Sequence, residues 1–140
     1  MAADQGVAVQ RIEQHAIDTA YDVVHARQAV RKAAVELGFS LIEQTKLVTA
    51  ASELARNTFE HGGGGTMTLE VIDKGGRRGL RMVFEDRGNG IPDITLALKD
   101  GYTTGDGLGL GLGGAKRLLG NLEVVSKVGE GTRVTAVRWK

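Results

Sequence analysis

Apolar residues recur at steps of three and four between residues 20 and 37, a spacing typical of one face of an amphipathic helix. Gly38 follows this segment and is expected to cap the carboxyl end of the helix. The sequence Ser40-Leu-Ile-Glu43 has the capping-box pattern, which predicts the start of a second helix over about 41–60. A run of four glycines ends this second helix. The first half of the chain is therefore expected to contain two consecutive helices.

Apolar and polar residues alternate around 67–71 and around 80–84, which predicts two strands joined by a hairpin loop over Asp73–Gly79. Elsewhere the pattern predicts a weak strand over 7–15, a helical turn around 93–99, a helix over 109–119, and strands over 122–128 and 132–139. Helices would then cover one face of a mixed, mainly antiparallel sheet. The predicted fold class is α+β, a two-layer sandwich. No linker or internal repeat divides the chain, so residues 1–140 are expected to form one domain.

The composition narrows the classes of function. Eighteen basic and 17 acidic residues leave a net charge of +1, which excludes a strongly basic nucleic-acid binder. The absence of cysteine excludes thiol catalysis and cysteine-ligated metals. No apolar run is long enough to span a membrane and no signal-peptide pattern opens the chain, so a cytoplasmic location is expected. Of the 21 glycines, only Gly6 and Gly38 precede residue 62, and this uneven placement is typical of loops that bind phosphates.

Three segments carry candidate chemistry, and the first is Glu53-Leu-Ala-Arg-Asn57 on the second helix. Glu53 and Asn57 are four residues apart, so both side chains project from one face. The amide oxygen of Asn57 suits Mg²⁺, and the Glu53 carboxylate could orient or deprotonate a hydroxyl. An exposed polar helix face explains the same pattern. His61 is interpreted as a cation at the helix carboxyl end rather than as a metal ligand.

The second segment runs from Glu85 to Asp93 and begins where a hydrophobic strand ends. Asp86 could accept a hydrogen bond from the exocyclic amine of a base. Gly88 and Gly90 would let a flat ring approach the backbone. A polar turn after a strand is the alternative interpretation.

The third segment places glycine at alternate positions over 105–113, immediately before a helix. Backbone N–H groups and the positive end of the helix would bind an anion there. Residues 109–114 satisfy G-x-G-x-x-G, but no preceding strand and no βαβ unit support a dinucleotide site. The sequence also lacks a P-loop lysine and the motifs of eukaryotic-type kinases. A flexible glycine loop is the alternative.

Together and in this order, the three segments resemble the GHKL (Bergerat) ATP-binding superfamily, which includes gyrase, Hsp90, MutL and histidine-kinase catalytic domains. Glu53-x-x-x-Asn57 resembles its N-box, Asp86-x-Gly88-x-Gly90 its G1 box, and Gly107-Leu-Gly109-Leu-Gly111 its G2 box. Thr132 matches the threonine of a late strand. The run Ser-Glu-Leu-Ala-Arg-Asn and the closing Arg-Trp-Lys further resemble the RsbT-type serine/threonine kinases of bacterial stressosomes.

This resemblance implies that ATP binds between the second helix, the sheet and a lid over 93–107. Asp86 would accept from the adenine amine, Thr132 would support it through water, Asn57 would hold Mg²⁺, and Glu53 would be the general base. The residues implied in binding the nucleotide are Asn57, Asp86, Gly88, Gly90, Thr103, Thr104, Gly107, Leu108, Gly109, Leu110, Gly111 and Thr132.

The resemblance also implies partners. The substrates would be STAS-domain scaffold proteins, and the released kinase would activate a PP2C-type phosphatase. Neither nucleic acid nor a membrane is an expected partner. Two other hypotheses stay open. One is an anti-sigma factor that sequesters a sigma factor and phosphorylates a STAS-domain antagonist. The other is an ATP-binding domain that acts mainly as an allosteric activator of a phosphatase.

Overall fold

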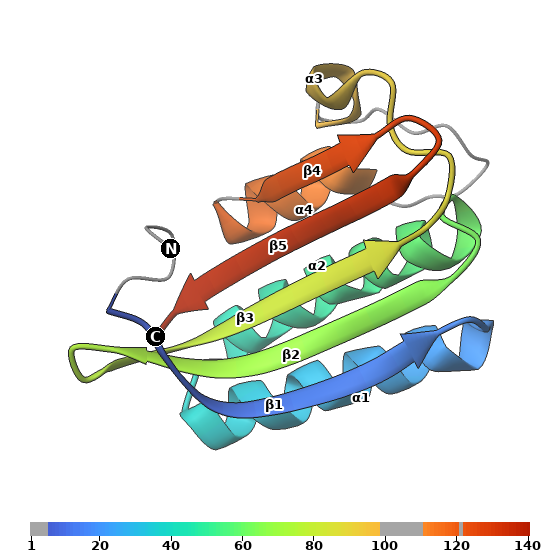
Figure 1. The fold of residues 1–140 in the computed structure, drawn as a ribbon. Coiled ribbons are helices and arrows are strands. Elements are labelled where there is room, and N and C mark those ends of the chain that lie inside the picture. The colour runs from blue at the N-terminus through green and yellow to red at the C-terminus, as the bar shows by residue number, and fades with distance from the viewer. Residues whose placement is uncertain (1–5, 99–110, 121) are drawn as a thin grey trace.

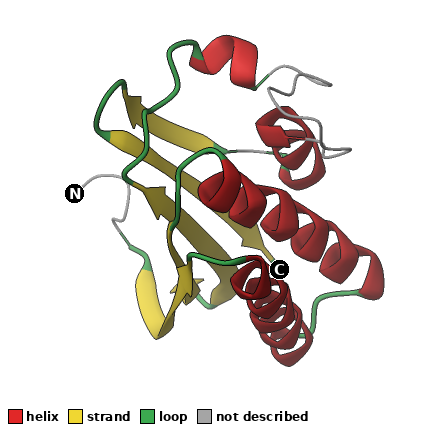
Figure 2. Cartoon of the chain, turned by 90° about the vertical axis from the view of Figure 1, so that its right-hand side faces the viewer, coloured by secondary structure: helices red, strands yellow, loops and turns green. Residues whose placement is uncertain are grey.

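The computed structural model describes residues 6–98, 111–120 and 122–140. Its strands are β1 (Ala8–Ile17), β2 (Gly65–Lys74), β3 (Arg77–Asp86), β4 (Glu123–Lys127) and β5 (Gly131–Trp139), and its helices are α1 (Ala20–Leu37), α2 (Leu41–Glu60), α3 (Ile94–Ala97) and α4 (Gly111–Leu119). The strands form one sheet in the order β1-β2-β3-β5-β4, with antiparallel pairing throughout this described part. Helices α1, α2 and α4 lie behind the sheet in Figure 1, and Figure 2 shows the two layers from the side. The predicted α+β sandwich is confirmed.

Local capping explains where the two long helices begin and end. The Thr19 hydroxyl accepts from the Asp22 N–H at 3.2 Å, and the Asp22 carboxylate accepts from the Thr19 N–H at 3.1 Å. This reciprocal box starts α1, and Gly38, at φ 82°, ends it. Hydrogen bonds from backbone N–H groups, that of Asp18 foremost, hold the pKa of Asp22 below its ordinary value.

The start of α2 differs from the prediction in one contact. The Ser40 hydroxyl accepts from the Glu43 N–H at 3.2 Å, as a capping box requires. The Glu43 carboxylate, however, receives a hydrogen bond from Arg138 on β5 at 2.6 Å. The side chain that the sequence assigned to a helix cap therefore ties α2 to the sheet.

The hairpin between β2 and β3 is tighter than predicted. The strands extend to Lys74 and from Arg77, so the turn consists of Gly75 and Gly76, both with positive φ. This geometry is favoured in two-residue hairpins because its twist matches that of the strands. The charged residues at the hairpin end, which had indicated a loop, are paired strand residues.

The core lies between the sheet and the helices, and large apolar side chains from both layers fill it, among them Leu47, Leu54, Met67, Leu80 and Phe84. Burial of these side chains drives the packing of α1 and α2 on the sheet. The strand register places Gly65, Asp86 and Thr132 side by side at one end of the sheet. The carboxyl end of α2 lies at the same end (Figure 1). Among the residues described, no helix is both long and apolar enough to cross a membrane.

Candidate functional site

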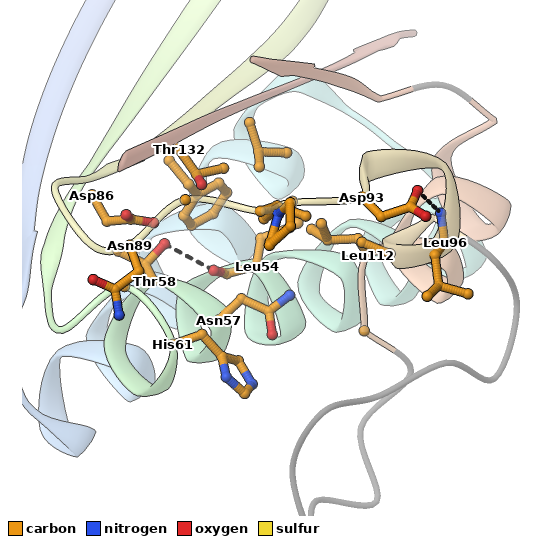
Figure 3. Close-up of a pocket in the computed structure, with 18 residues that line it drawn as sticks. Leu54, Asn57, Thr58, His61, Asp86, Asn89, Asp93, Leu96, Leu112 and Thr132 are labelled. Carbon is orange, nitrogen blue, oxygen red and sulfur yellow. Dashed lines mark hydrogen bonds between the residues drawn. The ribbon is translucent and has the colours of Figure 1, made fainter. Parts of the chain in front are cut away.

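A cavity of about 510 Å³ opens where α2, the end of β3 and the beginning of β5 meet. Figure 3 shows its lining side chains pointing into the space between the sheet and α2, with α3 at one side. The cavity is lined by Leu54, Asn57, Thr58, His61, Gly62, Phe84, Asp86, Asn89, Gly90, Ile91, Pro92, Asp93, Leu96, Ala97, Gly111, Leu112, Thr132 and Val134. Apolar walls with a few convergent polar groups are typical of small-molecule sites.

Asp86 lies at the end of β3, directly opposite Thr132 of β5 in the strand register. Both side chains line the cavity and lie near one another in Figure 3. One Asp86 carboxylate oxygen accepts from the backbone N–H of Gly88 at 2.8 Å, which holds the carboxylate in place. A carboxylate and a hydroxyl, the two groups that the family resemblance pairs, thus lie together at one end of the cavity.

Gly62 gives the Asp86 side chain its room. A methyl group added at Gly62 would lie 2.3 Å from the Asp86 Cγ atom, well inside contact distance. The sequence analysis interpreted this glycine only as part of a helix-ending run and missed its role. Four consecutive glycines were the available signal, because such a run exceeds what a helix end needs.

Asn57 and His61 enter the cavity from α2, one turn apart (Figure 3). His61 is the residue that caps α2, and its backbone N–H donates to the Asn57 carbonyl at 3.0 Å. The neighbouring Thr58 hydroxyl donates to the Leu54 carbonyl at 3.0 Å. Asn57 therefore brings a side-chain amide to the cavity beside a residue whose hydroxyl is already hydrogen-bonded.

Glu53 lies one turn before Asn57 and is only 8% exposed. One carboxylate oxygen accepts from the Arg56 guanidinium at 2.8 Å, and the other accepts from the Gly111 backbone N–H at 3.3 Å. Glu53 is not one of the described residues that line the cavity. It lies at the edge of the site, between α2 and the start of α4. The sequence analysis assigned no role to Arg56, although its spacing of three residues from Glu53 on a helix favours such a pair.

The remaining residues predicted to contact the nucleotide differ in where they lie. Gly88 and Gly90 make close contacts with the protein's own backbone, since added methyl groups would lie 2.8 Å from the Gly62 Cα and 2.4 Å from the Lys127 carbonyl. Gly90 also lines the cavity, as does Gly111 at the start of α4. Thr103, Thr104, Gly107, Leu108, Gly109 and Leu110 lie outside the described residues.

The sequence profile of histidine kinase-, DNA gyrase B- and HSP90-like ATPases matches residues 42–140. The chain belongs to this ATPase family. It is also 45% identical, over 123 residues, to the serine/threonine-protein kinase RsbT of Bacillus subtilis (strain 168), covering 88% of this chain and 92% of RsbT. Within the ATPase family, the chain is therefore a member of the RsbT-type protein kinases. The predictions of a GHKL fold and of a kinase are confirmed at this level.

Other relatives are more distant. The anti-sigma F factor of Clostridium kluyveri is 33% identical over 115 residues, covering 78% of this chain and 80% of that factor. The crystal structure of the RsbU and RsbW domains of a Mycobacterium tuberculosis protein aligns with a TM-score of 0.64 at 18% identity. That alignment covers 94% of this RsbT-type chain but only 33% of the mycobacterial one. The mycobacterial sensor histidine kinase MprB aligns with a TM-score of 0.55 at 18% identity, over 91% of this chain and 97% of MprB. These two structures show the shared fold.

Proposed function

We propose that this RsbT-type kinase transfers the γ-phosphoryl group of ATP, with Mg²⁺, to a serine or threonine of a STAS-domain protein. One observation supports this most directly. Asp86, Thr132 and Asn57 meet in a single cavity, with Glu53 one helical turn from Asn57, in a chain 45% identical to RsbT. The residues that the sequence assigned to separate tasks are thus close enough to act on one nucleotide.

The residues that line the cavity support placing adenine at its Asp86 end. Phe84, Ile91 and Val134 provide apolar walls for the flat faces of a base. The Asp86 carboxylate would accept from the exocyclic amine, and Thr132 would support it through a water. The phosphates would then extend along α2 toward Asn57 and the start of α4 at Gly111.

Mg²⁺ would enter with the nucleotide. Among the residues described, no group of three or more His, Cys, Asp or Glu side chains could hold a metal by itself. Asn57 brings one neutral amide to the cavity, and Mg²⁺ prefers oxygen ligands and keeps several waters. We therefore assign Asn57 as the protein ligand of an ion bound chiefly by phosphates and water.

Glu53 would act as the general base. In this step the Glu53 carboxylate takes the proton of the acceptor hydroxyl while that oxygen forms a bond to the γ-phosphorus. The bond from the γ-phosphorus to the bridging oxygen breaks, and ADP leaves with the electron pair. Each Glu53 carboxylate oxygen already accepts one hydrogen bond, from Arg56 or from Gly111, and each keeps a second lone pair that would take the proton of the hydroxyl.

Membership of the RsbT-type kinases supports a proposal for the partners. We propose that the chain acts as a single cytoplasmic domain, and that after phosphorylating its STAS-domain scaffold it is released to bind and activate a PP2C-type phosphatase. It would use neither nucleic acid nor a membrane as a partner. The predicted nucleotide contacts of Thr103, Thr104, Gly107, Leu108, Gly109 and Leu110 are part of this proposal, as are those of Gly88, Gly90 and Gly111.

An anti-sigma factor is the second candidate function. The 33% identity to the anti-sigma F factor favours it, although the coverage and identity to RsbT are higher. The two functions differ in whether a sigma factor is bound.

The test incubates the chain with γ-labelled ATP, Mg²⁺ and STAS-domain proteins from the same genome, and separately with its sigma factors. Label on a STAS protein, together with no stable sigma-factor complex, supports the kinase proposal. A sigma-factor complex that forms with ATP would favour the anti-sigma function. Absence of label on every STAS protein would contradict the proposed substrate.

A further inference from the structure

Ser126 on β4 connects three parts of the site through its hydroxyl. The oxygen accepts from the backbone N–H of Ile91 at 2.8 Å, lies 3.1 Å from the carbonyl of Gly131, and lies 2.8 Å from the hydroxyl of Thr132. Ser126 thereby joins the loop after β3 to the beginning of β5. The sequence alone does not reveal a role for this serine, because it occupies an ordinary strand position.

The directions of these hydrogen bonds can be worked out from the number of protons. A serine hydroxyl has one proton to donate and two lone pairs. The Gly131 carbonyl can only accept, so the hydrogen bonds to Gly131 and Thr132 form together only when the Ser126 proton points to Gly131. The Ser126 lone pairs then accept from the Ile91 N–H and from the hydroxyl proton of Thr132. Thr132 has used its only proton, and it offers the cavity nothing but lone pairs.

Asp86, which lies opposite Thr132 in the strand register, also only accepts hydrogen bonds. Asp86 is an acceptor when ionised, and it faces the same end of the cavity. A water that bridges Asp86 and Thr132 would donate one proton to each and would also turn only lone pairs to the ligand. This end of the cavity therefore accepts hydrogen bonds, directly or through water, and it favours a base that carries donors there.

We propose that Ser126 is a positioning residue that makes the site specific for a 6-amino purine, by keeping the Thr132 hydroxyl as an acceptor. This inference rests on the proposed function in one respect, namely that the base of the nucleotide lies against Asp86 and Thr132. Without the Ser126 hydroxyl, the Thr132 hydroxyl can rotate freely. Its proton can then point into the cavity and compete with the 6-amino group of the base for the acceptors there. The hydrogen bond from Ile91 gives Ser126 a structural role as well. The experiment therefore has to distinguish this structural role from the positioning of the Thr132 hydroxyl.

The experiment measures by calorimetry the affinities for ADP and for purine riboside diphosphate, which lacks only the 6-amino group. Their ratio reports the contribution of the amine. In Ser126→Ala this ratio falls about fivefold, the effect of roughly one hydrogen bond. In Ser126→Thr, which keeps a hydroxyl, the ratio stays near that of the unmodified chain. In Ser126→Cys, whose thiol is a weaker donor and acceptor, the ratio takes an intermediate value. This variant also replaces Ser126→Ala if Ser126→Ala does not fold.

A double-mutant cycle with Thr132→Val separates positioning from structure. If Ser126 acts through Thr132, Ser126→Ala leaves the ratio unchanged once the Thr132 hydroxyl is absent. A merely structural Ser126 weakens both ligands by the same factor in both backgrounds, and that result overturns the inference. If the unmodified chain binds neither ligand, the proposed function fails instead, so the two failures are distinguishable.

Discussion

The carboxylate of Glu53 on α2 accepts a hydrogen bond from the backbone N–H of Gly111, the first residue of α4, at 3.3 Å. A carboxylate is favoured at this end of a helix because the unpaired N–H groups there carry partial positive charge. The same carboxylate pairs with Arg56 at 2.8 Å. The proposed base thus connects the helix that carries Asn57 to the helix that follows the glycine-rich segment.

Asp86→Asn is expected to weaken ADP binding at least about tenfold, because a charged acceptor is lost and an amide donor faces the amine. Discrimination between ADP and GDP should fall as well. Titration calorimetry measures both effects. Asp73→Asn is the matched control. The Asp73 carboxylate also accepts a hydrogen bond from the backbone N–H of a glycine, Gly76, but it lies in the distant β2–β3 hairpin. Unchanged ADP affinity in folded Asp86→Asn would contradict the role of Asp86 in binding adenine.

Asn57→Ala is expected to keep the affinity for ADP without Mg²⁺ and to lose the gain that Mg²⁺ gives, because it removes a proposed oxygen ligand. ADP titrations with and without Mg²⁺ measure this. Gln28→Ala, on the exposed surface of α1, serves as the control. An equal enhancement by Mg²⁺ in Asn57→Ala and in the unmodified chain would contradict the ligand role.

Gly62→Ala should weaken ADP binding about tenfold by displacing the Asp86 carboxylate from its hydrogen bond. Gly75→Ala provides the contrast, since nothing lies within 4 Å of an added methyl there, but φ is +61°. We expect Gly75→Ala to lower the free energy of unfolding by about 1 kcal/mol and to leave binding unchanged. Calorimetry and denaturant unfolding of both variants decide the matter, and wild-type affinity in Gly62→Ala would contradict the packing argument.

The Glu43–Arg138 pair predicts a pH-dependent contribution to stability. The hydrogen bond from Arg138 is the main reason that the pKa of Glu43 lies below its ordinary value of 4.5. A carboxyl whose pKa is lower in the folded state stabilises the fold above pH 4.5, and this contribution is lost as pH falls through the folded pKa. Since both side chains are partly exposed, at 30% and 24%, we expect about 1 kcal/mol at pH 7.

Urea unfolding of Glu43→Gln across this range measures that contribution. The difference in unfolding free energy from the unmodified chain should be largest at pH 7 and should shrink below pH 4.5. Glu36→Gln, which breaks the more exposed pair with Arg11, is the control and should change stability by less than about 0.5 kcal/mol. A difference for Glu43→Gln that does not depend on pH would argue against the pair.

The elements that follow from local rules were predicted closely. The bounds of α1 and α2 agree with the predicted 20–37 and 41–60, because Gly38 and Ser40 act on their own neighbours. The hairpin was predicted too long, because exposed charged residues resemble a loop when the pairing partner is unknown. Predictions that depended only on residues close in sequence, such as the helix ends, were correct.

The contacts that distant residues make could not be predicted from local patterns. Asp86 and Thr132 were expected at one site only through the family resemblance, and the strand register places them opposite each other. Ser126 was missed because its role depends on residues of a loop and another strand, whereas Arg56 was missed although its pair with Glu53 lies within one turn of α2. Gly88 and Gly90 were expected to let a flat ring come close to the backbone. In this structure, each glycine lies close to another segment of the chain.

The central claim is that Glu53 takes the proton during phosphoryl transfer, and transfer of label from γ-labelled ATP to a STAS-domain protein tests it most directly. Glu53→Gln keeps the size of the side chain but not the basic carboxylate, and we expect transfer to fall about 10²- to 10⁴-fold. ADP affinity and co-elution with the STAS protein should persist. Arg56→Gln breaks the same ion pair but keeps the carboxylate, and it should keep most of the transfer rate. Transfer by Glu53→Gln at the wild-type rate would contradict the mechanism.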